Sequence, residues 1–191
     1  MIGEPQPAIV EVERAGLIAG KVLDVGCGTG EHTILLTRLG YDVLGIDFAP
    51  HAIDQARHAA ADRGVDARFE VADAMDLGAE SRYDTVVDSA LFHIFGIFGN
   101  RERSRYVASL RGATRPGARV HVLALSDAGR GFGPEVSDDA IKDAFADGWE
   151  LEALSATVYR GVVFAAQADA IGLPVGTRVE EPAWLARMHR I

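Results

Sequence analysis

Short apolar runs alternate with amphipathic stretches along the first three quarters of the chain. The compact apolar runs predict strands at residues 21–25, 42–46, 67–71, 83–89 and 119–125. Apolar residues with helical spacing predict helices at residues 8–19, 31–39, 52–63, 101–114 and 138–146. This alternation is typical of a parallel sheet whose strands are joined by right-handed crossovers.

The last quarter of the chain has a different pattern. Residues 149–159 and 183–191 alternate apolar and polar side chains, and a glycine-rich segment at 161–176 joins them. We expect these two runs to form an antiparallel hairpin at one edge of the sheet. The whole chain, residues 1–191, is therefore interpreted as one α/β domain. Its fold class is a doubly wound, mostly parallel seven-stranded sheet with helices on both faces and an antiparallel C-terminal edge hairpin.

The first predicted strand runs directly into a loop that contains Gly26, Gly28 and Gly30. Glycine has no Cβ, so such a loop can adopt positive φ and let a ligand lie against bare backbone. Seventeen residues after Gly30, the second strand ends at Asp47, whose carboxylate is suited to hold two ribose hydroxyls. Together these features predict a site for a nucleotide-like cofactor.

Glu31 stands where a dinucleotide-binding fingerprint would have its third glycine. A carboxylate in the first turn of a helix repels a pyrophosphate and competes for the same N–H groups. S-adenosylmethionine carries a sulfonium and no phosphate, so it fits this acidic loop better. Two alternatives stay open: a nicotinamide-dependent oxidoreductase, which Glu31 opposes, and a non-catalytic domain that binds S-adenosylmethionine or a protein partner.

The composition limits the other functions of the chain. Its 191 residues are 48% hydrophobic, its formal net charge is −9, and no block of Lys and Arg is present to neutralise phosphates. This pattern argues against a nucleic-acid or anionic membrane surface. Cys27 has no partner for a disulfide, and no metal ligand set is expected. No leader sequence or membrane-spanning run is evident, so we expect a cytoplasmic protein.

Further motifs carry a resemblance to a known family. They are the glycine loop, Asp47, residues 72–74 after the third strand and residues 115–117 before the fifth strand. With these motifs, nearly the whole chain resembles the class I S-adenosylmethionine-dependent methyltransferases, which have a Rossmann-like fold. Residues 2–7, 83–93 and 145–149 resemble a bacterial small-molecule subgroup. That subgroup includes the mycobacterial heterocyclic toxin methyltransferase and lies near the thiol and thiopurine methyltransferases.

The resemblance implies roles for residues around the cofactor. The backbone at the three loop glycines would face the methionine part, Asp47 would bind the ribose, and Phe48 would stack on adenine. Asp73 would accept from the adenine amino group, and the Ala74 N–H would address a ring nitrogen. Asp24 and Asp88 would face the methionine amine. Simpler interpretations are a turn residue for Asp73 and a core residue for Phe48.

The acceptor is expected beyond the fourth strand, where doubly wound sheets bind their ligands. Ser89, Phe92 and His93 are the candidate acceptor-binding residues, and His93 is the candidate general base, with a packing histidine as the alternative. The expected reaction moves a methyl group from S-adenosylmethionine to an O, N or S atom of a small aromatic or heterocyclic molecule and leaves S-adenosylhomocysteine. Because relatives carry a covering segment ahead of residues 2–7, we expect an open acceptor pocket or a homodimer partner over it.

Overall fold

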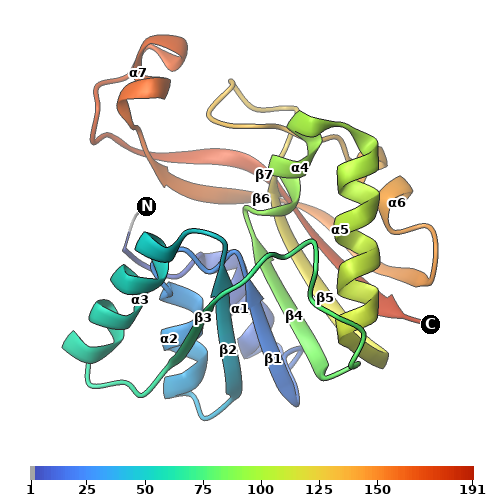
Figure 1. Ribbon diagram of the computed structural model, residues 1–191. Coiled ribbons are helices and arrows are strands. Elements are labelled where there is room, and N and C mark those ends of the chain that lie inside the picture. The colour runs from blue at the N-terminus through green and yellow to red at the C-terminus, as the bar shows by residue number, and fades with distance from the viewer. Residues whose placement is uncertain (1–2) are drawn as a thin grey trace.

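The computed structural model describes residues 3–191, so Ile2 of the motif at residues 2–7 lies outside the described part. Seven strands form a single sheet in the order β3-β2-β1-β4-β5-β7-β6 (Figure 1). β1 to β5 run parallel, whereas β7 is antiparallel to both β5 and β6. The predicted fold class is confirmed. The strands are β1 Lys21–Val25, β2 Asp42–Asp47, β3 Arg68–Val71, β4 Tyr83–Ser89, β5 Thr114–Leu125, β6 Trp149–Val162 and β7 Arg178–Arg190.

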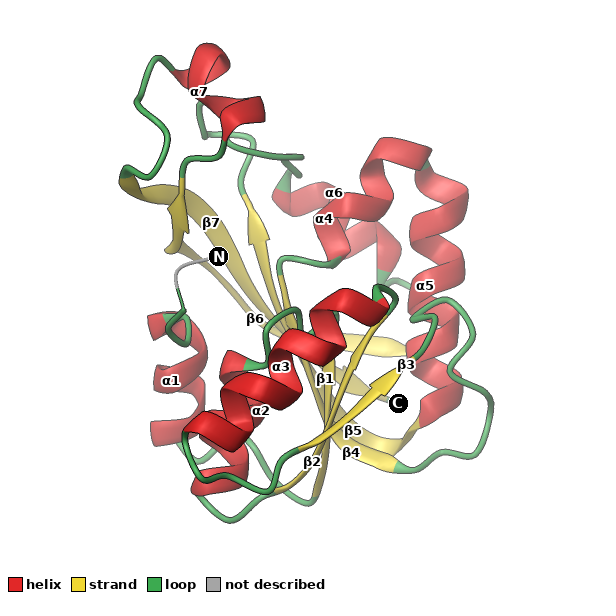
Figure 2. Ribbon diagram, turned by 60° about the vertical axis from the view of Figure 1, so that its left-hand side comes forward, coloured by secondary structure: helices red, strands yellow, loops and turns green. Residues whose placement is uncertain are grey.

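Helices cover both faces of this sheet (Figure 2). One face packs on α1, α2 and α3, and the other packs on α4, α5 and α6. A seventh helix, α7, lies at the tip of the β6–β7 hairpin and projects beyond the sheet (Figure 1). The helices are α1 Pro7–Arg14, α2 Glu31–Arg38, α3 Pro50–Asp62, α4 Phe92–Phe95, α5 Asn100–Ala113, α6 Asp138–Ala144 and α7 Ala165–Ile171.

Several helix boundaries follow local chemistry. Pro50 begins α3. Proline has no N–H, but an N–H in the first turn of a helix has no partner within the helix, so no hydrogen bond is lost. The Ser137 hydroxyl accepts a hydrogen bond from the Ala140 N–H at 3.1 Å and so caps α6. Beyond α2, Gly40 has a φ of 92° and ends the helix.

Two helical segments differ from the sequence-based expectation. The apolar stretch after β4, where no helix was predicted, forms α4 and a 3₁₀ turn, Gly96–Phe98. Buried Asp88 supplies the reason, because its Oδ1 accepts hydrogen bonds from the N–H groups of Leu91 and Phe92 and so caps the turn. The glycine-rich segment between β6 and β7 contains α7, which ends at Gly172 in the left-handed conformation.

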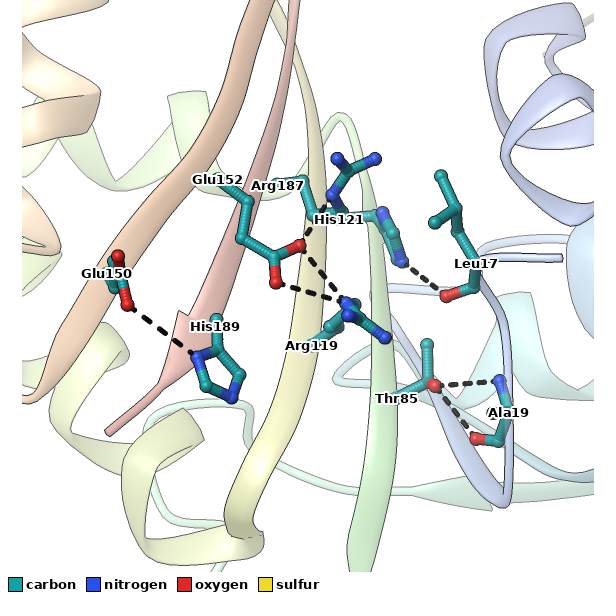
Figure 3. A network of polar contacts seen from close by, with 9 residues as sticks. All are labelled: Leu17, Ala19, Thr85, Arg119, His121, Glu150, Glu152, Arg187 and His189. Carbon is teal, nitrogen blue, oxygen red and sulfur yellow. Dashed lines mark hydrogen bonds and ion pairs between the residues drawn. The ribbon is translucent and has the colours of Figure 1, made fainter. Parts of the chain in front are cut away.

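Side chains on the sheet anchor the loop between α1 and β1 (Figure 3). The Thr85 hydroxyl accepts from the Ala19 N–H at 3.1 Å and donates to the Ala19 carbonyl at 2.8 Å. Buried His121 donates from Nε2 to the Leu17 carbonyl at 3.1 Å. The loop backbone is therefore held directly against β4 and β5.

Ion pairs tie the last three strands together on the same side of the sheet (Figure 3). Glu152 of β6 accepts from the Nε atoms of Arg119 on β5 and Arg187 on β7, at 3.0 and 2.7 Å. These hydrogen bonds lower the pKa of the Glu152 carboxyl. The pairs reinforce the register of the antiparallel edge.

Gln6 ties the N-terminal segment to the outer strand, β6. Its buried side-chain amide donates to the Arg160 carbonyl at 2.8 Å and accepts from the Arg160 N–H at 2.9 Å. Its backbone N–H donates to Nε2 of His32 at 3.0 Å. One residue therefore joins three parts of the chain: the N-terminal segment, the outer strand and the first turn of α2.

Substituting Gln6→Ala removes both hydrogen bonds to Arg160 but keeps the backbone donation to His32. We expect the free energy of unfolding to fall by about 1 to 3 kcal/mol, because two partly buried hydrogen bonds to the Arg160 backbone are lost. Urea denaturation measures this change. Glu4→Gln is the control, because it removes only the exposed ion pair with Arg178 and should cost less than about 0.5 kcal/mol. Equal effects of the two variants would contradict the role given to Gln6.

Candidate active site

The loop after β1 adopts a conformation that its glycines make possible. Gly26 and Gly30 have φ angles of 69° and 82°, in the left-handed region that residues with a Cβ rarely occupy. A Cβ at Gly26 would lie 3.0 Å from the Leu91 side chain, and one at Gly30 would lie 2.7 Å from the Phe69 ring. The loop can therefore approach its neighbours closely and expose its backbone at the carboxyl end of the sheet.

Asp47 joins this loop to the end of β2. One carboxylate oxygen, Oδ2, accepts from the Gly28 N–H at 2.9 Å, and the other, Oδ1, accepts from the Ala49 N–H at 2.9 Å. The side chain is half-buried, and it lines a hollow of about 380 Å³. Its two backbone bonds fix a carboxylate at the mouth of that hollow, where a vicinal diol can donate to it.

The hollow beside Asp47 has mostly apolar walls. Phe48, Asp73 and Ala74, all expected near the adenine, line it together with Gly26. Phe48 is 76% exposed, so the interpretation as a core residue is wrong. Asp73 does form a turn, because its Oδ1 accepts from the Met75 N–H at 2.8 Å. Apolar walls, one fixed carboxylate and exposed loop backbone match the chemistry of an adenosine without phosphates.

A smaller hollow of about 60 Å³ lies on the other side of the glycine loop. Gly26 and Gly28 line it, and so do Ser89 at the end of β4 and Tyr159 of β6. Ser89 was a candidate acceptor-binding residue. Tyr159 was not, because it lies 70 residues beyond Ser89 in a strand with no functional motif. The methionine part of the cofactor would extend along this side, towards Ser89 and Tyr159.

Asp24 and Asp88 lie at strand ends as expected, but their carboxylates point at the protein. Oδ2 of Asp24 accepts from the N–H and the hydroxyl of Thr33 at 3.0 and 2.6 Å. Oδ2 of Asp88 accepts from the Tyr106 hydroxyl at 2.6 Å, and burial raises the pKa of each aspartate to about 6. Both side chains are buried, and they hold α2 and α4 in place, whereas their contact with the methionine amine stays a prediction.

His93 lies within the protein, with Nδ1 accepting the Leu125 N–H at 3.1 Å. Burial lowers the pKa of His93 to about 4, so the ring is neutral at pH 7 and carries its proton on Nε2. The only ring nitrogen with a lone pair is therefore already occupied. This geometry favours the packing interpretation of His93 over the general base.

Phe92 and His32 also occupy positions other than the substrate pocket. Phe92 is fully buried, with its ring 5.8 Å from the Phe145 ring, so the expected acceptor contact is corrected to a core contact. His32 lines the smaller hollow, and its Nε2 accepts a hydrogen bond from the backbone N–H of Gln6. Burial lowers the pKa of His32 to about 4.

Glu31 is paired with a cation rather than facing the glycine loop alone. Arg63 donates two hydrogen bonds to its carboxylate, at 2.6 and 3.1 Å. This bidentate pair offsets the negative charge that was expected to repel a pyrophosphate. Glu31 by itself is therefore weaker evidence against a dinucleotide than the sequence alone indicates.

Residues 3–191 contain no cluster of three or more side chains arranged to hold a metal ion. Within the same residues, no helix has both the length and the apolar character needed to cross a membrane.

Comparisons with known proteins define the class. Residues 22–117 match the methyltransferase domain family. The chain is 34% identical to the 2-heptyl-1-hydroxyquinolin-4(1H)-one methyltransferase of Mycobacteroides abscessus, over 81% of this chain and 69% of that protein. The chain belongs to this family, and it is a class I methyltransferase that uses S-adenosylmethionine.

Solved structures agree with this assignment. The chain is 41% identical to a protein solved in a study of the conversion of a disulfide bond into a thioacetal group during echinomycin biosynthesis. That alignment covers 99% of this chain and 83% of the other, with a TM-score of 0.85. The fold is also shared with magnesium protoporphyrin IX methyltransferase from Synechocystis, solved with bound S-adenosylmethionine, at 17% identity, a TM-score of 0.66 and coverage of 96% and 76%. The family places methyl transfer ahead of the oxidoreductase and non-catalytic alternatives.

Burial of His93 predicts a pH-dependent contribution to stability. Its folded pKa of about 4 lies below the unfolded value of 6.5, so its contribution is present above pH 6.5 and is lost as the pH falls towards 4. In His93→Asn, the Asn oxygen can accept the Leu125 N–H, but no group titrates. We expect urea denaturation to show that the variant loses less stability than wild type between pH 6.5 and 4. The difference in slope corresponds to the uptake of up to about one proton on unfolding.

Asp24 and Asp88 have raised pKa values, so their contributions change in the opposite direction over this range. They are present in both proteins, and the comparison between wild type and His93→Asn cancels them. Identical pH profiles for the two proteins would contradict a neutral, buried His93.

Proposed function

We propose that this methyltransferase acts on an O, N or S atom of a small aromatic or heterocyclic molecule. The observation that carries the proposal is the apolar character of the mouth of the cofactor hollow. Phe48, Ile97 and Phe98 are exposed there or beside it, although large apolar side chains are usually buried. With the adenine on Phe48, a planar apolar acceptor that extends from the site would cover Ile97 and Phe98. The hydroxyquinolone methylated by the relative in Mycobacteroides abscessus is a molecule of this kind.

The charge of the protein supports a small molecule over a polyanion. A net charge of −9 opposes the approach of nucleic acid, since a nucleic-acid site depends on Lys and Arg side chains to displace counterions. We extend the proposal to a small-molecule acceptor that enters the site from the cytoplasm.

Bound S-adenosylmethionine supplies a methyl group on a positively charged sulfur. The chain binds and orients the two reactants. Asp47 would accept from the ribose hydroxyls, the glycine loop would contact the methionine part, and Phe48 would cover the adenine. Ser89 and Tyr159 would then border the space where the acceptor meets the methyl group. Alignment of the reacting atoms and exclusion of water supply the rate enhancement in this arrangement.

Asp47→Ala should weaken the binding of S-adenosylhomocysteine by about 1.5 to 3 kcal/mol, because a carboxylate that accepts hydrogen bonds from the ribose is lost. Calorimetric titration measures the change. Asp42→Asn is the matched control, since Asp42 lies at the opposite end of the same strand and is exposed. The control should bind as the wild type does. Equal affinities for wild type and Asp47→Ala would reject the ribose contact.

Transfer of a labelled methyl group from S-adenosylmethionine to a panel of phenols, hydroxyquinolones and aromatic thiols tests the reaction. We expect label in at least one of these aromatic acceptors. His93→Asn should keep its rates within about threefold of wild type, because the ring is not placed to take a proton; a general base would contribute about 10²-fold or more. A protein that binds S-adenosylmethionine but labels no acceptor would favour the non-catalytic alternative.

A further inference from the structure

Glu181 of β7 is a buried carboxylate that is only partly satisfied. Its side chain is 1% exposed. Both Nε and Nη2 of Arg130 donate to the same oxygen, Oε1, at 2.8 and 2.6 Å. The other oxygen, Oε2, is buried and has no hydrogen-bond partner among residues 3–191.

A buried carboxylate oxygen without a donor is costly in free energy, and native proteins rarely leave one. The neighbourhood of Glu181 makes the cost larger, because an apolar cluster surrounds this part of the hairpin. Its members include Leu125, Phe132, Val163 and Val179. Oε2 of Glu181 is therefore available to accept a hydrogen bond from an O–H or N–H group of a ligand.

The position of Glu181 connects it to the methyl-transfer site. It is the direct cross-strand partner of Tyr159, and side chains of paired residues project from the same face of a sheet. Tyr159 lines the hollow beside the glycine loop, together with Ser89. Glu181 therefore stands next to the wall where the acceptor side of the site is expected.

The loop that contains Arg130 contributes to the cover over Glu181. Arg130 lies between β5 and α6, in a segment that also contains Gly129, Gly131 and Gly133. Gly131 has a φ of 79°, and its N–H donates to Glu135 within the same loop at 2.7 Å. The glycines allow backbone conformations that other residues rarely adopt, and a displacement of this loop would open a path to Oε2.

The other buried carboxylates at this end of the sheet already have partners. Asp24 is bonded to Thr33, and Asp88 is bonded to Tyr106 and the start of α4. His93 has its unprotonated nitrogen occupied by the Leu125 N–H. Glu181 is the buried group here whose acceptor atom is left for a ligand.

We propose that Oε2 of Glu181 accepts a hydrogen bond from an O–H or N–H of the methyl acceptor. The proposal rests on the proposed function and specifies its substrate class: an aromatic molecule that carries a neutral hydrogen-bond donor. Arg130 fixes the carboxylate from the opposite side. An anionic acceptor such as a thiolate gains nothing from this contact, because it would meet the carboxylate with like charge.

Glu181→Gln gives a sharp test because Arg130 dictates the amide orientation. The Gln oxygen would face the Arg130 donors, so its NH₂ would replace Oε2 and present a donor where an acceptor stood. Binding of 2-naphthol and 2-naphthalenethiol is measured at mildly alkaline pH, on protein saturated with S-adenosylhomocysteine. At this pH the naphthol keeps its O–H, whereas the thiol is largely ionised to a thiolate. The two ligands have nearly the same shape.

Wild type should bind the naphthol more tightly than the thiolate. Glu181→Gln should weaken naphthol binding about tenfold or more and leave thiolate binding equal or tighter. Two controls separate recognition from loop anchoring. Glu135→Ala removes the acceptor of the Gly131 N–H and so loosens the loop, but it keeps both Glu181 and Arg130, and Glu180→Gln removes the exposed neighbouring charge. Both controls should keep the wild-type preference for naphthol.

Three results would overturn the proposal. They are equal losses for both ligands in Glu181→Gln, the same reversal in Glu135→Ala, and no naphthol binding to wild-type protein that binds S-adenosylhomocysteine. The methyl-transfer panel judges the proposed function separately. If Glu181→Gln reverses the ligand preference but no acceptor is labelled, the Glu181 contact is retained and the proposed reaction is rejected. If an acceptor is labelled but the preference does not reverse, the reaction is retained and the Glu181 contact is rejected.

Discussion

The carboxylate of Asp47 is the interaction on which the site depends. It accepts from the backbone of Gly28 and of Ala49, and so joins the loop after β1 to the end of β2. A backbone bond from the Cys27 N–H to the Ile46 carbonyl at 2.8 Å reinforces the same junction. Two neighbouring parallel strands thus end in one rigid unit. The conformation of the glycine loop and the position of the Asp47 carboxylate, which we propose to bind the ribose, are therefore fixed together.

The other side of the site is built from distant parts of the chain. The β6–β7 hairpin brings Tyr159 to the glycine loop, and Gln6 pins the N-terminal segment to the outer strand. These contacts span more than 150 residues in the case of Gln6. The proposed cofactor side is thus local, whereas the proposed acceptor side is assembled from the N-terminal segment, the hairpin and a glycine-containing loop. Such a division lets acceptor preference change without altering cofactor binding.

Local signals in the sequence were enough to predict the sheet and the cofactor side. Glycines, an acidic residue at a strand end and helix caps act over a few residues, so Gly26 and Asp47 could be placed without a structure. His93 and Asp88 could not, because their roles depend on the backbone of Leu125 and on the Tyr106 hydroxyl. Glu181 carries no motif at all: only the register of β6 against β7 places it beside Tyr159.

A crystal structure of the protein with S-adenosylhomocysteine would show how the two sides of the site are used. We expect adenine against Phe48, both ribose hydroxyls on the carboxylate of Asp47, and the sulfur at the side of the glycine loop that Ser89 and Tyr159 border. A ribose that does not touch Asp47, or a sulfur that points away from Ser89 and Tyr159, would contradict the assignment of the two sides of the site.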